Sequence, residues 1–339
     1  MARGMRRMNN TTKWLVNVAA FAVIALAMKA SAPLITQILI ILFLAIIISP
    51  AYYFLRRLRF PPWLALAALI LAISFTCLHT AGYTIPRAAW KFGKELPAYI
   101  EQLARVSGEA REWLKGNNIA VPESFYEEMT KIDSATVSKY LKQTGTITAN
   151  FFKSAIFVVI IVCFILCELP TLPARAKNLP WMTEDLWARL SAMVLDVRRY
   201  MGIKTVISAL TGLLVYLGLL VLGVSSPILM GILAFAMNFV PFIGSILAAV
   251  PAVILAMLVP EGGLALGLYT SAWYLVVNMA LGNVLEPKLM GRGFGVSPVL
   301  VLISLIFWGW ALGPVGMFFA VPLTMAARGA IVSIRSSKE

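Results

Sequence analysis

The sequence predicts an all-α, polytopic integral membrane protein with about six full transmembrane helices, two re-entrant helical hairpins of opposite orientation and a small helical extracytoplasmic insert. Hydrophobic residues make up 60% of the 339 residues and charged residues only 13%, a composition typical of a chain with many membrane spans. Two long apolar segments, 227–259 and 298–325, are interrupted by proline and glycine. One polar segment, 87–149, separates the N-terminal spans from the rest of the chain.

Residues 1–86 contain the first three expected spans. Segments 14–28 and 33–54 are apolar and are joined by a short turn, so we expect a helical hairpin in the membrane. The third span follows at 63–85, after a basic loop that ends in two prolines. The basic start, the apolar run and the Ala-Ser-Ala sequence at 30–32 also suit a secretory signal peptide, which stays open as the alternative for this start of the chain.

Residues 87–149 are predicted to form a helical insert outside the cytoplasm. Apolar residues recur there at helical spacing from Leu96 to Leu114 and again from Val137 to Thr148. Such amphipathic helices are too few for a core of their own, so we expect them to pack on each other or on a neighbouring subunit. Their charges lie on the polar faces, where a solvated role is the default.

Residues 150–204 combine a transmembrane helix with an amphipathic helix at the cytoplasmic membrane surface. Residues 151–169 form the span, and Thr183 is suited to cap the helix that follows. The apolar stripe of that helix runs from Leu186 to Met201 and lies opposite three arginines. Lys204, at its end, is expected to extend toward the membrane surface.

Residues 205–328 contain two further spans, at 205–223 and 263–281, and the two broken segments. A helix needs about 20 residues to cross a hydrocarbon core of roughly 30 Å, whereas each arm of the second broken segment reaches only about 20 Å. We therefore expect two hairpins that enter the membrane from opposite faces, the second broken at Gly309, Gly313 and Gly316. Irregular backbone at that depth survives only beside protein or a water-filled cavity, and in transporters it marks substrate sites.

The net charge of +14 is explained by membrane orientation, so no nucleic-acid partner is expected. The insert is almost neutral, and most other basic residues fall into five clusters. These are Arg3/Arg6/Arg7/Lys13, Arg56/Arg57/Arg59, six residues from Arg175 to Lys204, Lys288/Arg292 and Arg328/Arg335/Lys338. Basic residues favour cytoplasmic loops, and one topology places all five clusters inside. In it both termini are cytoplasmic, including the tail 329–339, and residues 87–149 are extracytoplasmic.

No metal, cofactor or catalytic centre is predicted. The three cysteines (Cys77, Cys163 and Cys167) lie in apolar segments, where free cysteine behaves as a small hydrophobe. The chain has one histidine and no phosphate-binding loop. An intramembrane hydrolase needs a metal site, a serine with a base or paired carboxylates, so the protein is not expected to be an enzyme.

Glu286 is the best candidate for a functional carboxylate. It precedes Pro287, which removes a backbone donor and is expected to disfavour helix at Glu286 itself. A carboxylate in such a place can bind a cation or exchange a proton. The alternative is a residue at the cytoplasmic edge that pairs with Lys288 or Arg292.

The other candidates for solute or ion binding are polar or helix-breaking residues near the first hairpin and on the span that follows it. They are Asn238, Pro241, Gly244, Ser245, Asn278 and Asn283. Their side-chain oxygens and the backbone groups freed at the break can coordinate a polar solute or a monovalent cation. The alternative is that they satisfy the hydrogen bonds of the hairpin tip itself.

Three motifs together are similar to a known family. They are Tyr200-Met-Gly-Ile-Lys-Thr-Val-Ile-Ser-Ala-Leu-Thr-Gly212, Asn238-Phe-Val-Pro-Phe-Ile-Gly-Ser245, and Glu286-Pro-Lys-Leu-Met-Gly291 with the later Gly313-Pro-Val-Gly316. In this set and in its layout the chain resembles the autoinducer-2 exporter family of bacterial membrane proteins.

The resemblance implies a secondary transporter in the bacterial inner membrane, a homo-oligomer and plausibly a pentamer. Family members are associated with export of autoinducer-2 and some with sodium(lithium)/proton antiport, so both functions stay open, with H⁺ or Na⁺ as a possible coupling ion. A membrane scaffold that does not transport is the further alternative.

Overall fold

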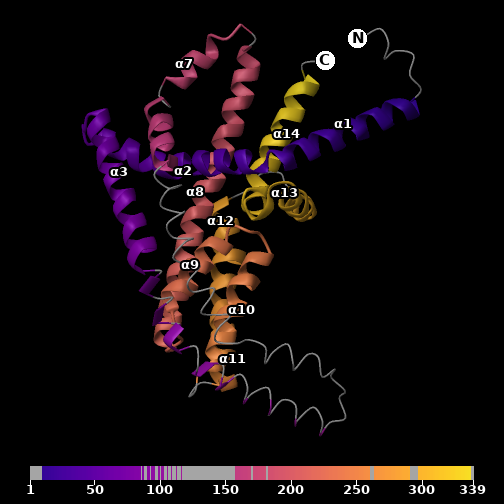
Figure 1. The fold of residues 1–339 in the computed structure, drawn as a ribbon. Coiled ribbons are helices and arrows are strands. Elements are labelled where there is room, and N and C mark those ends of the chain that lie inside the picture. The colour runs from indigo at the N-terminus through magenta and orange to yellow at the C-terminus, as the bar shows by residue number, and fades with distance from the viewer. Residues whose placement is uncertain are drawn as a thin grey trace. The chain divides into compact units, whose positions relative to one another are not determined.

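The computed structural model describes residues 10–84, positions scattered between 86 and 116, and residues 157–168, 171–180, 182–259, 263–290 and 297–336. All regular secondary structure in these residues is helical, as the sequence predicts (Figure 1). The helices fall into two compact units. Unit 1 comprises residues 1–46, 174–201 and 292–339, and unit 2 comprises residues 47–173 and 202–291. Apart from the scattered positions, the insert predicted at 87–149 lies outside the described residues.

Four helices in the described residues are long and apolar enough to cross a membrane. They are Ala32–Arg57, Glu184–Val221, Gly263–Met290 and Pro298–Phe318. Shorter apolar helices occur at Trp14–Ala30, Pro62–Thr76 and Phe157–Glu168, where the sequence predicts three further spans. The count of six full spans and the insertion depth of both hairpins stay predictions.

Aromatic side chains join the first helix of unit 1 to α13. Its helices are α1 (Asn10–Ala30), the first part of α2 (Ala32–Arg57), most of α7 (Leu172–Lys177), the first part of α8 (Glu184–Val221), α13 (Pro298–Phe318) and α14 (Ala320–Ser336). Phe21 of α1 stacks on Phe307 of α13 with ring centroids 5.9 Å apart. Lys29 Nζ lies 4.5 Å from the ring centroid of Trp310. Both contacts attach α1 to α13.

The helix α8 begins as the sequence predicts but does not end where expected. The hydroxyl of Thr183 accepts a hydrogen bond from the backbone N–H of Leu186 at 3.2 Å, the capping contact that starts the helix. The helix then runs without interruption to Val221. The predicted surface helix and the predicted span are therefore one helix. A lone glycine at 202 costs only about 1 kcal/mol in a helix interior and does not break it.

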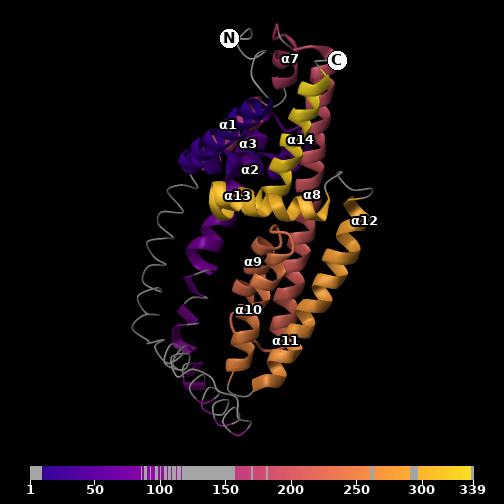
Figure 2. The ribbon, with the colours of Figure 1, turned by 90° about the vertical axis from the view of Figure 1, so that its right-hand side faces the viewer.

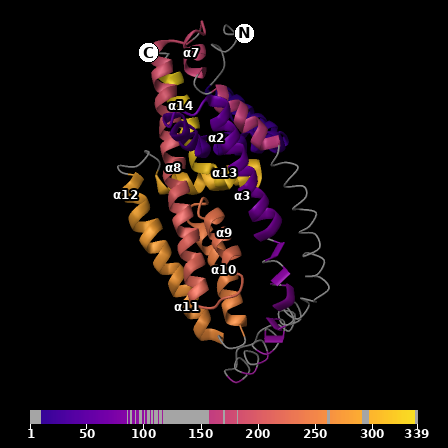
Figure 3. The same ribbon diagram turned by 90° about the vertical axis from the view of Figure 1, so that its left-hand side faces the viewer.

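Unit 2 is built around the second part of α8. Its other helices are the end of α2, α3 (Pro62–His79), the π-helix η2 (Thr80–Thr84), α9 (Pro227–Met237), α10 (Ile243–Leu258), α11 (Gly263–Val277), the π-helix η3 (Asn278–Leu285) and α12 (Glu286–Met290). Figures 2 and 3, from opposite sides, show α9, α10 and α11 alongside α8, and α10 also packs against α11.

Glycine allows α8 to approach both neighbours closely. A Cβ on Gly212 would stand 2.7 Å from the carbonyl oxygen of Gly231 in α9. On the side of α11, the indole of Trp273 covers Gly218, and its Nε1 donates to the carbonyl of Leu214 at 3.0 Å. Small residues at such contacts let helix backbones pack tightly where lipid removes the hydrophobic driving force.

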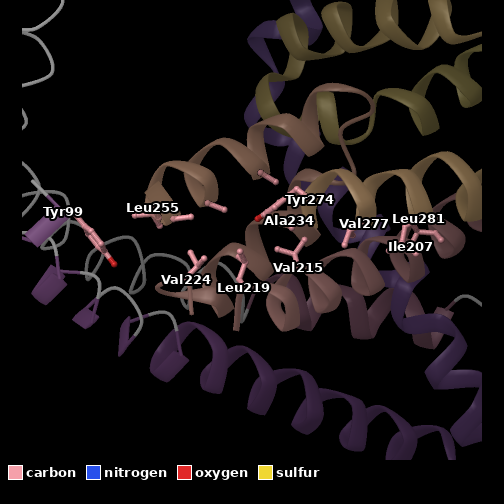
Figure 4. Close-up of a cluster of buried hydrophobic side chains, with 13 residues drawn as sticks. Tyr99, Ile207, Val215, Leu219, Val224, Ala234, Leu255, Tyr274, Val277 and Leu281 are labelled. Carbon is pink, nitrogen blue, oxygen red and sulfur yellow. The ribbon is translucent and has the colours of Figure 1, made fainter. Parts of the chain in front are cut away.

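The core of unit 2 lies among α8, α9, α10 and α11 (Figure 4). Its buried members are Tyr99, Ile207, Val215, Leu219, Val224, Ala234, Ala248, Ala252, Leu255, Ala256, Tyr274, Val277 and Leu281. Several are alanines on α10, so this helix packs closely against the others. Of the candidate residues from the sequence, Gly244 and Ser245 lie on α10, and Asn278 and Asn283 lie on η3, which directly follows α11.

Candidate functional site

Two buried polar side chains lie one turn apart on α8. Lys204 is 5% exposed and Ser208 is 0% exposed. Because residues four apart share a helix face, the two lie about 6 Å from each other along the axis. An ionisable residue inside an apolar helix is costly and indicates a functional site by default.

Lys204 forms an ion pair with Glu286. Its Nζ donates to Oε1 of the carboxylate at 2.7 Å and to Oε2 at 2.9 Å. The side chains are 6% and 17% exposed, respectively. The expectation that Lys204 extends toward the membrane surface is wrong, because a charge buried in protein needs a counter-ion. The partner of Glu286 is Lys204 and not the exposed Lys288.

Glu286 lies at the end of the π-helix η3. Its backbone N–H donates to the carbonyl of Leu281, five residues earlier, and its own φ and ψ are −58° and −51°. The prediction that Pro287 disfavours helix at Glu286 is therefore wrong. The wider π-turn before the proline absorbs the distortion, and the helical path continues through Glu286. Single π-turns inside α-helices are frequent at functional sites.

Asn238, at the tip of the first hairpin, contacts the same face of α8. Its Nδ2 donates to the hydroxyl of Ser208 at 3.0 Å. Glu286 and Asn238 are far apart in the sequence, yet they contact residues one turn apart on α8. The structure thus brings two of the predicted site residues to one polar strip, which we define as Lys204, Ser208, Asn238 and Glu286.

The tip between α9 and α10 is a tight turn. The segment from Asn238 to Phe242 joins the helices and includes the half-buried Pro241. Phe242 has φ 63° and ψ −53°, a conformation that costs a bulky residue about 1–3 kcal/mol. A Cβ on Gly244 would collide with the carbonyl of Met237, so only glycine fits there. The helix is therefore interrupted between Met237 and Ile243, whereas the depth of this turn in the membrane stays a prediction.

A cavity of about 470 Å³ lies between α10 and the helix formed by α11 and η3. Ser245 and Asn278 line it together with Ser271 and Tyr274, and its other walls are apolar. Within the described residues, the buried hydroxyl of Tyr274 has no hydrogen-bond partner. The predicted residues Ser245 and Asn278 thus lie together. Neither Asn238 nor Glu286 lines this cavity. Asn283 is exposed.

The glycines predicted to break the second hairpin all lie in unit 1. Gly313 has φ 70° and ψ −155°, which interrupts α13. A Cβ on Gly316 would collide with the carbonyl of Trp308, and a Cβ on Gly309 would stand 2.7 Å from Met317. The chain therefore folds back on itself between these residues.

Hydrogen bonds join the two arms of this second hairpin. The indole Nε1 of Trp308 donates to Thr324 Oγ1 at 3.1 Å, and that hydroxyl donates to Ser304 Oγ at 2.7 Å. Ser304 is 4% exposed. This polar chain lies inside an otherwise apolar helix pair, as Ser208 and Asn238 do in unit 2.

Sequence reasoning misses Lys204, Ser208 and Tyr274 as parts of these sites. The sequence does hold a signal for Lys204 and Ser208, since both are polar and they lie four residues apart in an apolar segment. Tyr274 has no comparable signal, because an aromatic residue in a membrane helix is ordinary. In the described part of the chain, no group of three or more His, Cys, Asp or Glu side chains is placed to hold a metal ion.

Apolar helices of membrane-spanning length with buried polar groups between them are more typical of a membrane transport protein than of an enzyme. Comparison with known proteins agrees. The model of the AI-2E family of transporters matches residues 18–336, so the chain belongs to this family. It is a transporter and not an enzyme.

Relatives with curated descriptions match nearly the full length. The AI-2 transport protein TqsA of Escherichia coli K12 is 31% identical over 95% of this chain and 92% of its own length. A Haemophilus influenzae protein, whose name marks it as a candidate transport protein, is 31% identical over 96% of this chain and 93% of its own length. YhhT of Escherichia coli K12, named in the same way, is 32% identical over 93% of this chain and 88% of its own length.

Proposed function

We propose that the protein is a secondary transporter that moves a small polar solute, such as autoinducer-2, across the bacterial inner membrane by alternating access. The name of the relative TqsA supports the solute class. A gradient of H⁺ or Na⁺ drives the movement, since the sequence has no phosphate-binding loop for ATP.

The observation that carries this proposal is the polar strip on α8. Desolvating two charges in a membrane protein costs several kcal/mol for each ion, and a well-packed apolar pair gives equal or greater stability. A chain that keeps the buried Lys204 paired with the half-buried Glu286 among apolar helices thus gains something other than stability. The strip joins the broken hairpin tip to the π-helix, two elements with irregular backbone of the kind that lines transporter sites.

The test is flux through the full chain in proteoliposomes, with autoinducer-2 efflux and cation/proton exchange measured side by side. We expect Glu286→Gln to reduce flux to the background of empty vesicles, because the variant removes the carboxylate that holds the buried ammonium. The matched control is Glu184→Gln, which neutralises an exposed carboxylate in the first turn of α8. Flux through the control is expected to stay unchanged.

A folding defect is separated from a transport defect by a second variant. Breaking a buried pair by removing one partner costs about 3–5 kcal/mol, whereas removing both charges leaves no uncompensated ion. The double variant Lys204→Gln/Glu286→Gln is therefore expected to assemble normally and still not transport. Normal flux through either variant contradicts the proposal.

Sodium(lithium)/proton antiport is the second candidate function. The ion pair favours it, because a carboxylate that already holds an ammonium ion can hold another monovalent cation. In the liposome panel, cation/proton exchange without autoinducer-2 efflux selects this function.

The transport unit is proposed to lie in the inner membrane with both termini in the cytoplasm and residues 87–149 outside. Its partners are membrane lipid and further copies of the chain, with a homopentamer as the assembly expected from the family resemblance. Native mass spectrometry of the solubilised chain tests the assembly.

A further inference from the structure

We infer that the cavity between α10 and the helix formed by α11 and η3 binds a neutral amphiphile that enters from the membrane, of the class of a medium-chain alcohol. This binding site is separate from the polar strip and goes beyond the proposed transport function. The cavity has a volume of about 470 Å³, and small-molecule sites in proteins have volumes of about 300–1,000 Å³. It is therefore large enough for one small organic molecule.

The cavity has a polar end and an apolar length. The helix α11 runs back along α10, because Met257 near the end of α10 covers Gly267 near the start of α11. Ser245, in the first turn of α10, and Asn278, directly after α11, therefore lie at the opposite end of this helix pair. From Ser245 the cavity wall extends along α10 to Ile254, a length of about 14 Å. A ligand with a polar head and an apolar chain matches this arrangement.

The hydroxyl of Tyr274 supplies a contact for the polar head of the ligand. Tyr274 lines the cavity one turn before Asn278 and is 7% exposed. Within the described residues, its buried hydroxyl has no hydrogen-bond partner, although a buried tyrosine hydroxyl usually has one. The hydroxyl of Ser271 already donates to the carbonyl of Gly267, at 2.8 Å. A hydroxyl or carbonyl group of the ligand is thus a suitable acceptor for the proton of Tyr274.

The walls of the cavity favour a molecule that carries no charge. Among the described residues, none that lines the cavity has an ionisable acid or base. An ionised ligand would lose its hydration there without gaining a counter-ion, which is strongly unfavourable. A strongly polar solute would likewise leave most of its hydrogen-bonding groups without partners. The ligand therefore differs in class from the small polar solute proposed for transport. The apolar lining residues are Ile246, Ala249, Val250, Val253, Ile254 and Leu275.

The cavity is continuous with an exposed apolar face of α10 and α11. Four of its lining residues are exposed, namely Ile246, Val250, Ile254 and Leu275. In a chain whose apolar helices lie in a membrane, such a face contacts the hydrocarbon chains of the lipid. A molecule dissolved in the bilayer therefore reaches the cavity directly, and its apolar chain stays in an apolar environment as it enters.

The test is photolabelling of the full chain in lipid nanodiscs by an octanol that carries a diazirine on its chain, followed by mass spectrometry of the peptides. We expect saturable labelling within residues 245–254 and 271–278, which line the cavity, and displacement of the label by unmodified octanol. Octane has the same chain without the hydroxyl and is the matched competitor. It is expected to displace the label about two- to tenfold less effectively, the net effect of one hydrogen bond.

Two variants test the polar contact and the cavity itself. Tyr274→Phe removes only the hydroxyl, so it is expected to weaken binding of the probe about two- to tenfold and to make octanol and octane equal competitors. Tyr269→Phe is the matched control, because Tyr269 is exposed on α11 and does not line the cavity. Its labelling is expected to equal that of the wild type. Should Tyr274→Phe fail to fold, Ala249→Leu keeps the test decisive, since a larger side chain at this lining position fills the cavity and is expected to abolish the labelling.

Several outcomes overturn the inference. They are equal displacement by octanol and octane in the wild type, unchanged binding of the probe to Tyr274→Phe, labelling spread evenly over all membrane helices, and absence of labelling. Displacement of the probe by autoinducer-2 also overturns it, because the cavity then belongs to the transported solute. Binding is measured without flux, so each of these results leaves the proposed transport standing. Labelling as expected, together with no flux of solute or cation in liposomes, supports the site and contradicts the proposed function instead.

Discussion

Gly244 packs directly against the end of the opposite arm of the first hairpin. Because a Cβ there would collide with the carbonyl of Met237, Gly244→Ala forces the tip open. We expect the variant to lose about 1–3 kcal/mol of stability, the usual cost of overpacking. Thermal unfolding of the detergent-solubilised chain measures this loss as a lower midpoint.

Gly202→Ala is the matched control for this prediction. Gly202 lies exposed on α8, and a Cβ there meets nothing within 4 Å. In a helix, alanine is favoured over glycine by about 1 kcal/mol, so the control is expected to unfold at the same or a higher temperature. Equal midpoints for Gly244→Ala and wild type show that the tip does not depend on glycine.

Residues whose role is set by the local backbone are the ones that the sequence predicts well. Gly244 and Gly313 follow from the chemistry of glycine and proline, and the cap at Thr183 follows from its position before two acids. The partner of Glu286 does not follow in this way. Lys204 lies 82 residues away, and their contact depends on how α8 packs against α11 and α12.

At the scale of elements, the hydrogen bond between Asn238 and Ser208 attaches the hairpin tip to α8. Hydrogen bonds between membrane helices average about 0.6 kcal/mol in double-mutant cycles. A cycle of Asn238→Ala and Ser208→Ala, read by unfolding free energy, is expected to give a coupling of about this size. We expect the same cycle, read by flux, to show that either single variant weakens transport.

The control cycle combines Asn238→Ala with Ser271→Ala. The hydroxyl of Ser271 donates to the carbonyl of Gly267 within α11, at 2.8 Å. Since it has no part in the contact between tip and α8, the two changes are expected to be additive. Additive behaviour of Asn238→Ala and Ser208→Ala shows instead that the tip and α8 are not coupled.

Element boundaries are predicted less well than element types, and α8 shows the reason. The sequence changes from amphipathic to apolar near Lys204, and this change suggests two helices. Backbone hydrogen bonding is insensitive to that change, so one helix runs from Glu184 to Val221. An amphipathic pattern indicates what surrounds a helix. The end of a helix is indicated instead by a helix-breaking glycine or proline or by a capping residue.

For the whole molecule, the basic clusters predict which side of the membrane each loop occupies. Lys204 does not belong to these clusters of loop charges, because it is buried in an ion pair. The other basic residues of the five clusters still predict cytoplasmic loops. The orientation is therefore expected to hold without Lys204, since the bias is set by lysines and arginines close to the ends of the spans.

A single cysteine at position 120 tests this orientation. The three native cysteines are first replaced by alanine, and Ala120→Cys is then expected to react with a membrane-impermeant maleimide in intact cells. Leu58→Cys, in the exposed turn after α2, is the matched control and is expected to react only after the cells are made permeable. The opposite result at both positions means that the basic clusters face outward. In that case the orientation proposed for both termini and for residues 87–149 is wrong, whereas the ion pair between Lys204 and Glu286 is unaffected.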